Sequence, residues 1–177
     1  PLASVLCAQI RSCCPFFECV QIVRFAAKNQ VTYTRISSIG GPAMYPAQQP
    51  LSQHLRDSHL QSWTRIGSPG DFFSARDRIE MVRVARDATL CEFCEDRKAA
   101  LSPNAISGKH LSSSRLSDVV VDMIHRLRTD PGRLTKSWFD QVTHEISRQE
   151  YVEIVSVVNS AVIIDTLHNA LGLGVPS

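Results

Sequence analysis

The segment that most constrains the fold lies near the C-terminus and predicts one long, buried helix. Ser147 and Glu150 form an S-x-x-E capping box, which marks a helix start. Gly172 marks the helix end, and Pro176 follows it. Valine and isoleucine also suit a strand, but the length, the cap and the glycine favour a helix that is apolar on nearly all sides, as in a protein core. Its apolar residues are Tyr151, Val152, Ile154, Val155, Val157, Val158, Ala161, Val162, Ile164, Leu167 and Leu171.

The chain before this segment carries further helical patterns. Residues 51–63 form a first amphipathic segment. Ser74 begins the next one, with Asp77 three residues later as a near-match to the capping box. Residues 118–128, with a serine just before them, and residues 134–144 complete the pattern. The chain has no internal repeat and no alternation of strands with helices, so the sequence predicts an all-α fold.

Length and composition indicate one ordinary helical domain with an extension. The chain has 177 residues, of which 44% are hydrophobic and 20% charged, enough for one domain with a real core. We place that domain at residues 50–177. The net charge of +2 is too small to indicate nucleic acid as a partner. No apolar run approaches the roughly 20 residues that span a bilayer, so no membrane is expected.

Residues 1–49 differ from the rest of the chain. They begin with an apolar, cysteine-rich run and end in a stretch rich in glycine and proline. We interpret them as a poorly specified N-terminal extension and assign no chemistry to them. Their cysteines are Cys7, Cys13, Cys14 and Cys19.

The other two cysteines form the motif Cys91-Glu92-Phe93-Cys94. Cysteines three apart lie on one side of a helical turn, so their sulfur atoms can meet. This is the geometry of a redox-active dithiol, in which one thiolate attacks a substrate and the other closes a disulfide. A helix break near residues 89–90 would place Cys91 at a helix start, where unpaired N–H groups favour a thiolate.

Two other interpretations of the motif stay open, half of a zinc site and a pair of structural cysteines. A zinc site needs a second ligand pair. No cysteine follows Cys94, and His110, His125, His144 and His168 include no H-x(3–5)-H pair. The spacing therefore favours redox chemistry, with no metal and no cofactor beyond a Cys91–Cys94 disulfide.

Several polar residues are further candidates for the site. His110, in a polar loop, is a candidate acid/base group that returns to the dithiol, although a solvated histidine is the simpler interpretation. His125 lies beside the apolar face of its helix, which favours a packing or capping role. Asp165 and His168 are three apart on the long helix, and a structural polar pair is favoured there.

The order of these motifs resembles the AhpD-like, carboxymuconolactone-decarboxylase superfamily, and within it the alkylhydroperoxidase-related branch. The resemblance covers about residues 51–176. The segments that carry it are residues 91–94, 97–103, Gly108 and His110, 125–127, 129–138, 151–155 and 170–173.

The resemblance implies an all-helical, usually oligomeric protein that reduces hydroperoxides or a peroxiredoxin partner with its CxxC. By this analogy Cys94 attacks peroxide and Cys91 resolves. Family members relay protons through an upstream glutamate and a histidine four residues past the second cysteine. Here Lys98 stands at the histidine position, and the upstream acid is Glu80 or Asp77. A lysine lowers a thiol pKa by its charge but is a poor general base near neutral pH.

Three functions follow as hypotheses. The first is a thiol-dependent oxidoreductase that takes a hydroperoxide and a thiol or dithiol protein reductant, as a homo-oligomer. The second is a lactone decarboxylase like that of the other branch of the superfamily, which needs no dithiol. The third is a non-catalytic helical oligomer that has lost the relay histidine. A CxxC without the spacing of structural disulfides suits a reducing cytoplasm.

Overall fold

The computed structural model describes residues 44–110 and 113–176, and the described residues form helices without a strand. The predicted all-α fold is confirmed. The N-terminal cysteines lie outside the described residues. The helices are α3 (Gln53–Ile66), α4 (Ala75–Asp87), α5 (Glu92–Ala99), α6 (Asp118–Thr129), α7 (Lys136–Glu145) and α8 (Arg148–Ala170), with the 3₁₀ helices η1 (Ala88–Leu90), η2 (Pro103–Ala105) and η3 (Pro131–Arg133).

Local capping sets most helix starts, as the sequence predicts. Ser74 and Asp77 form a complete capping box at α4, and Ser147 and Glu150 form another at α8. Each box satisfies two backbone N–H groups that the helix leaves without a partner. Ser117 holds the cap position of α6, but its hydroxyl makes no capping hydrogen bond.

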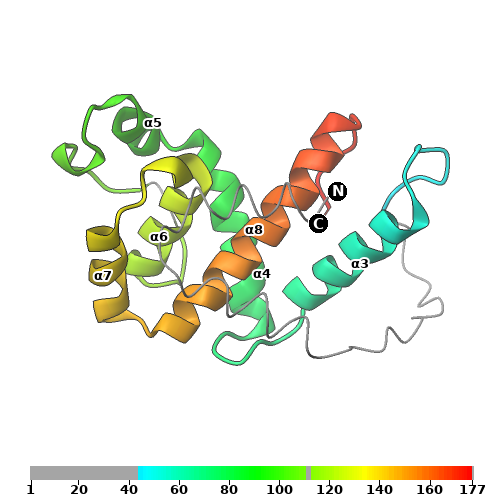
Figure 1. Ribbon diagram of the computed structural model, residues 1–177, viewed down its shortest axis with the longest axis horizontal. Coiled ribbons are helices and arrows are strands. Elements are labelled where there is room, and N and C mark those ends of the chain that lie inside the picture. Colours follow the sequence, from blue (N-terminus) through cyan, green and yellow to red (C-terminus); the bar gives the residue numbers. More distant parts are fainter. Residues whose placement is uncertain (1–43, 111–112, 177) are drawn as a thin grey trace. The chain divides into compact units, whose positions relative to one another are not determined.

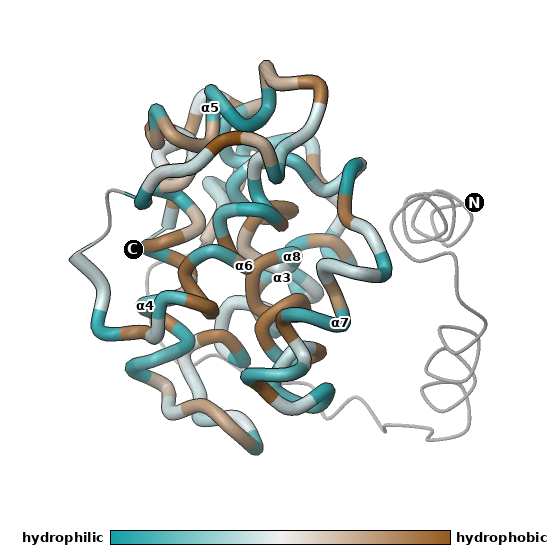
Figure 2. The backbone as a smooth tube through the Cα atoms, turned by 90° about the vertical axis from the view of Figure 1, so that its left-hand side faces the viewer, coloured by the Kyte–Doolittle hydropathy of each residue, from teal (hydrophilic) through white to brown (hydrophobic). Residues whose placement is uncertain are grey.

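Helix α8 lies at the centre of the packing. It contacts α3, α4 and α6, and Figure 1 shows it crossing between α3 on one side and α6 on the other. Ile154 and Val158 of α8 are fully buried, as are Met81 of α4 and Ile124 of α6. Hydrophobic colour gathers along α6 and α8 in Figure 2. Burial of apolar side chains makes the main favourable contribution to the stability of a helical fold.

The same helix is long and apolar enough, by length and composition alone, to cross a membrane. It has 23 residues, and its most apolar window has a mean hydropathy of 1.3. The domain buries 39% of that window. The core helix of a globular domain passes the same test, and the packing of Ile154 and Val158 is of that type.

In the described part of the chain, packing begins before α3. Tyr45 is only 2% exposed. Its hydroxyl oxygen lies 2.5 Å from Nδ1 of His59, and its ring lies 4.6 Å from that of His168. The sequence groups residues 44–49 with the extension by their composition. In the structure they contribute a core side chain, that of Tyr45.

The C-terminal end of α8 is fixed by hydrogen bonds. Gly172 adopts a left-handed φ of 67° after the helix, a conformation that favours glycine. The chain then turns back, and Nδ1 of His168 hydrogen-bonds the carbonyl oxygen of Gly174 at 2.8 Å. Asp165 accepts two hydrogen bonds from the Arg86 guanidinium, both at 2.8 Å. Asp165 and His168 thus have different partners rather than each other.

Candidate functional site

The two cysteines of the CxxC lie where the chain turns from α4 into α5. The 3₁₀ helix η1 breaks the chain after α4, and Cys91 then occupies the N-cap of α5 in an extended conformation. Its carbonyl oxygen accepts the N–H of Cys94 at 3.0 Å, so the two cysteines flank one turn. Both are buried, at 2% and 3% exposure, and no disulfide joins them. The predicted break before Cys91 is confirmed.

The side chain of His110 reaches both sulfur atoms. Its Nδ1 lies 3.6 Å from Sγ of Cys91 and 3.5 Å from Sγ of Cys94. Cys91 makes no side-chain capping bond with the start of α5. The His110 imidazole is therefore a partner of the Cys91 sulfur, in place of the capping contact with backbone N–H groups that the sequence suggested.

The loop that carries His110 packs on the aromatic ring of Phe93, inside the CxxC. The rings of Phe93 and His110 meet edge to face at 5.0 Å. A Cβ on Gly108 would lie 2.6 Å from Cδ2 of Phe93, closer than real Cβ atoms approach. The loop can therefore come this near only because residue 108 is glycine.

Helix α6 supplies an acidic partner for His110. Oδ1 of Asp122 lies 3.0 Å from Nε2 of His110 and accepts a hydrogen bond of 2.6 Å from Nη1 of Arg97. A carboxylate on one ring nitrogen fixes the orientation of an imidazole and stabilises its charged form. The His110 imidazole therefore lies between the cysteine thiols and the Asp122 carboxylate. Sites in which a histidine activates a nucleophile have this arrangement.

His125 lies one turn after Asp122 on α6 and borders the same sulfur pair. It is fully buried, and its Nδ1 is 3.3 Å from Sγ of Cys94. The His110 and His125 rings are 4.0 Å apart. No described residue hydrogen-bonds its buried Nε2.

The two histidines have opposite protonation. Burial lowers the pKa of His110, but hydrogen bonds with Asp122 and the two cysteines outweigh burial and raise the pKa to about 10. Burial and the nearby His110 charge lower the pKa of His125 to about 4. Burial opposes ionisation of Asp122, yet the contacts with His110 and Arg97 hold its pKa well below its usual range. At neutral pH the site therefore contains one imidazolium and one neutral imidazole.

A pocket of about 240 Å³ reaches one of the two cysteines. Cys94 lines it together with two cationic side chains, Lys98 and Arg128. Cys91 is not among the lining residues. The remaining lining residues are Ala88, Thr89, Glu95 and Thr129.

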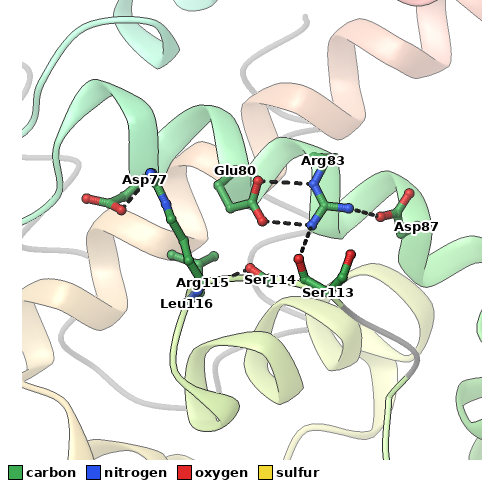
Figure 3. Close-up of polar contacts among 8 residues, drawn as sticks. All are labelled: Asp77, Glu80, Arg83, Asp87, Ser113, Ser114, Arg115 and Leu116. Atoms are coloured by element: carbon green, nitrogen blue, oxygen red, sulfur yellow. Dashed lines mark hydrogen bonds and ion pairs between the residues drawn. The ribbon is translucent and has the colours of Figure 1, made fainter.

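The other candidates from the sequence lie away from the sulfur atoms. Glu80 receives two hydrogen bonds from Arg83, at 3.0 and 2.7 Å, and faces the loop at Ser114, as Figure 3 shows. Asp77 caps α4 and pairs with Arg115 at 2.8 Å. The structure therefore brings together Cys91, Cys94 and His110, with Lys98 at the pocket, and leaves both upstream acids in structural contacts.

The sequence did not single out Asp122, and for His125 it favoured a packing or capping role. The signal for both was an aspartate and a histidine three residues apart on one predicted helix, which places them on the same face. Arg97 was also missed as the second partner of Asp122.

The chain was compared with protein-family models, with curated proteins and with solved structures, and it matches none of them.

Proposed function

We propose that the protein is a thiol-dependent oxidoreductase that reduces a hydroperoxide, or the disulfide of a partner protein, with the Cys91–Cys94 dithiol. One observation carries the proposal: Nδ1 of His110 lies within 3.6 Å of both sulfur atoms while Asp122 holds its other nitrogen. An imidazolium beside a thiol stabilises the thiolate, which is the nucleophile.

Cys94 is the attacking cysteine in this proposal, because it borders the pocket and Cys91 does not. The Cys94 thiolate attacks the terminal oxygen of the hydroperoxide, and the O–O bond breaks. The His110 imidazolium gives its proton to the departing alkoxide, so an alcohol leaves and Cys94 becomes a sulfenic acid.

Cys91 completes the reaction. Neutral His110 takes the proton of the Cys91 thiol, and the new thiolate attacks the sulfur of Cys94. The departing hydroxide takes the proton back from His110 and leaves as water. The balance is one hydroperoxide and two thiols converted to an alcohol, water and a disulfide, which an external dithiol then reduces.

The test is peroxide consumption with dithiothreitol as reductant, in a chain whose Cys7, Cys13, Cys14 and Cys19 are replaced by serine. This background variant is the control and is expected to keep the activity. Cys94→Ser is expected to abolish peroxide consumption.

Cys91→Ser is expected to allow one oxidation without turnover, leaving a sulfenic acid on Cys94 that dimedone labels. Unchanged turnover in both single variants would contradict the proposal. Lactone decarboxylation that survives replacement of both cysteines would favour the lyase instead.

A further inference from the structure

The two cysteines and two histidines of the site surround one point in space. Each offers one ligand atom, and the four atoms all lie within 4.8 Å of one another. The four side chains are Cys91, Cys94, His110 and His125. Two come from the start of α5, one from the loop after η2 and one from α6.

Their spacing fits a tetrahedral metal ion. Zinc binds sulfur at about 2.3 Å and nitrogen at about 2.0–2.1 Å, so tetrahedral angles put bound sulfur and nitrogen about 3.5–3.6 Å apart. Three of the four sulfur–nitrogen distances in the site are 3.6, 3.5 and 3.3 Å, and the fourth pair lies within 4.8 Å. These three distances are close to those that a tetrahedral zinc ion imposes.

The surroundings also orient both imidazoles as ligands. Each points Nδ1 at the sulfur atoms. Asp122 holds Nε2 of His110, which is the outer contact that metal-binding histidines commonly make. Nε2 of His125 is buried and has no partner among the described residues, so no hydrogen bond in the described part of the chain competes for the orientation of that ring.

We propose that the reduced site binds one Zn²⁺ through Cys91, Cys94, His110 and His125. Two thiolates and two imidazoles favour zinc over the oxygen-preferring Mg²⁺ and Ca²⁺. Four protein ligands fill a tetrahedral shell and leave no open position, which is typical of a structural or regulatory zinc rather than a catalytic one.

Zinc binding and disulfide formation exclude each other, because both need the same two sulfur atoms. When a hydroperoxide oxidises the bound thiolates, the S–S bond forms, the hydroperoxide takes two protons and becomes alcohol and water, and Zn²⁺ is released. Zinc binding itself does not depend on the proposed peroxide chemistry, and it is measured without peroxide.

The experiment is an anaerobic titration of the reduced full chain with Co²⁺, in the background with serine at the four N-terminal cysteine positions. We expect one equivalent to bind, with the intense visible bands of tetrahedral Co²⁺ and sulfur-to-metal charge transfer, and Zn²⁺ to displace it. Cys91→Ser and His125→Gln are expected to lose this spectrum. Asp122→Asn is expected to weaken binding by about 10–100-fold.

His144→Ala is the matched control, because His144 is exposed on α7, and it is expected to bind as the background does. Since His125 is buried and its variant can fail to fold, X-ray absorption at the zinc edge of the background protein gives a second measurement. Coordination of the zinc by two sulfur and two imidazole ligands supports the proposal. Absence of stoichiometric binding, a spectrum that both site variants retain, or a shell without two sulfurs overturns it.

Failure of the two proposals can be told apart. Peroxide turnover without metal binding removes the zinc site and leaves the oxidoreductase. Metal binding without peroxide turnover removes the oxidoreductase and leaves the zinc site.

Discussion

Nε2 of His110 lies 3.0 Å from Oδ1 of Asp122, and this contact joins the loop before α6 to α6 itself. The carboxylate orients the imidazole so that its other nitrogen faces both sulfur atoms. Asp122 touches neither sulfur in any described contact, so it acts as a positioning residue.

Asp122→Asn is expected to slow alkylation of Cys94 by iodoacetamide on the order of tenfold, because the imidazolium that stabilises the thiolate loses its anionic partner. The measurement is the alkylation rate across pH, by mass spectrometry. Because the contact with Asp122 helps to raise the pKa of His110, its loss is expected to lower that pKa and to change the pH dependence of the rate, which a purely structural loss of packing would not produce. An unchanged profile would remove Asp122 from this role.

Gly108→Ala is expected to push the His110 loop away from the CxxC, because the added Cβ would meet the Phe93 ring at 2.6 Å. Overpacking of this kind costs about 1–3 kcal/mol. The rate of Cys94 alkylation by iodoacetamide is expected to change, and the affinity of the site for metal is expected to fall. Gly132→Ala is the matched control, since a Cβ there meets nothing within 4 Å, and it should behave as the wild type in both assays.

Ile154→Ala is expected to lower the free energy of unfolding by about 2–5 kcal/mol, because the residue is fully buried in the core and its truncation leaves a cavity. Ile163→Ala on the same helix is the control. Ile163 is 48% exposed, and its truncation should cost well under half as much. Urea unfolding measures both, and equal costs would contradict the placement of α8 in the core.

Asp165→Ala is expected to destabilise the protein by about 3 kcal/mol, the low end of values for broken buried ion pairs. The carboxylate is 10% exposed and receives both hydrogen bonds from Arg86, which also binds the Pro176 carbonyl. Asp140→Ala removes the exposed pair with Lys136 and should cost less than about 1 kcal/mol. Thermal unfolding of the two variants checks the difference.

We expect the contribution of Glu80 to the free energy of unfolding to depend on pH. Hydrogen bonds from Arg83 lower the pKa of Glu80 to about 2 from its usual 4.5. A carboxylate whose pKa is lower in the folded state stabilises the protein above pH 4.5, and this contribution is lost as the pH falls towards 2. Glu80→Gln should therefore be less stable than wild type at neutral pH, with a difference that shrinks in acid. Urea unfolding at several pH values measures it, and a constant difference would contradict the origin proposed here.

The helices could be predicted because their signals are local. The capping boxes of Ser74 and Ser147 join residues three apart, so the printed sequence contains the whole interaction. The observed helix ends differ from the predicted ones by a few residues. The helix expected to begin at residue 134 begins at Lys136, because the Thr135 hydroxyl accepts the N–H of Trp138. Similarly, α3 continues to Ile66 and stops before Gly67.

The site was predictable only in part. The CxxC lies within one turn, and its two sulfur atoms belong together by geometry. His110 was a candidate, but nothing in its neighbourhood along the chain singled it out from a solvated histidine. No H-x(3–5)-H spacing linked His110 to His125, and yet their rings lie 4.0 Å apart.

By itself the sequence determined the helices, the break before Cys91 and the closeness of the two cysteines, because all of these depend on interactions within a few residues. The tertiary structure decided what surrounds the sulfur atoms. His110 is 16 residues from Cys94 along the chain and His125 is 31. Only the packing of the His110 loop and of α6 against α5 brings those imidazoles to the dithiol, and no local propensity specifies contacts over such distances.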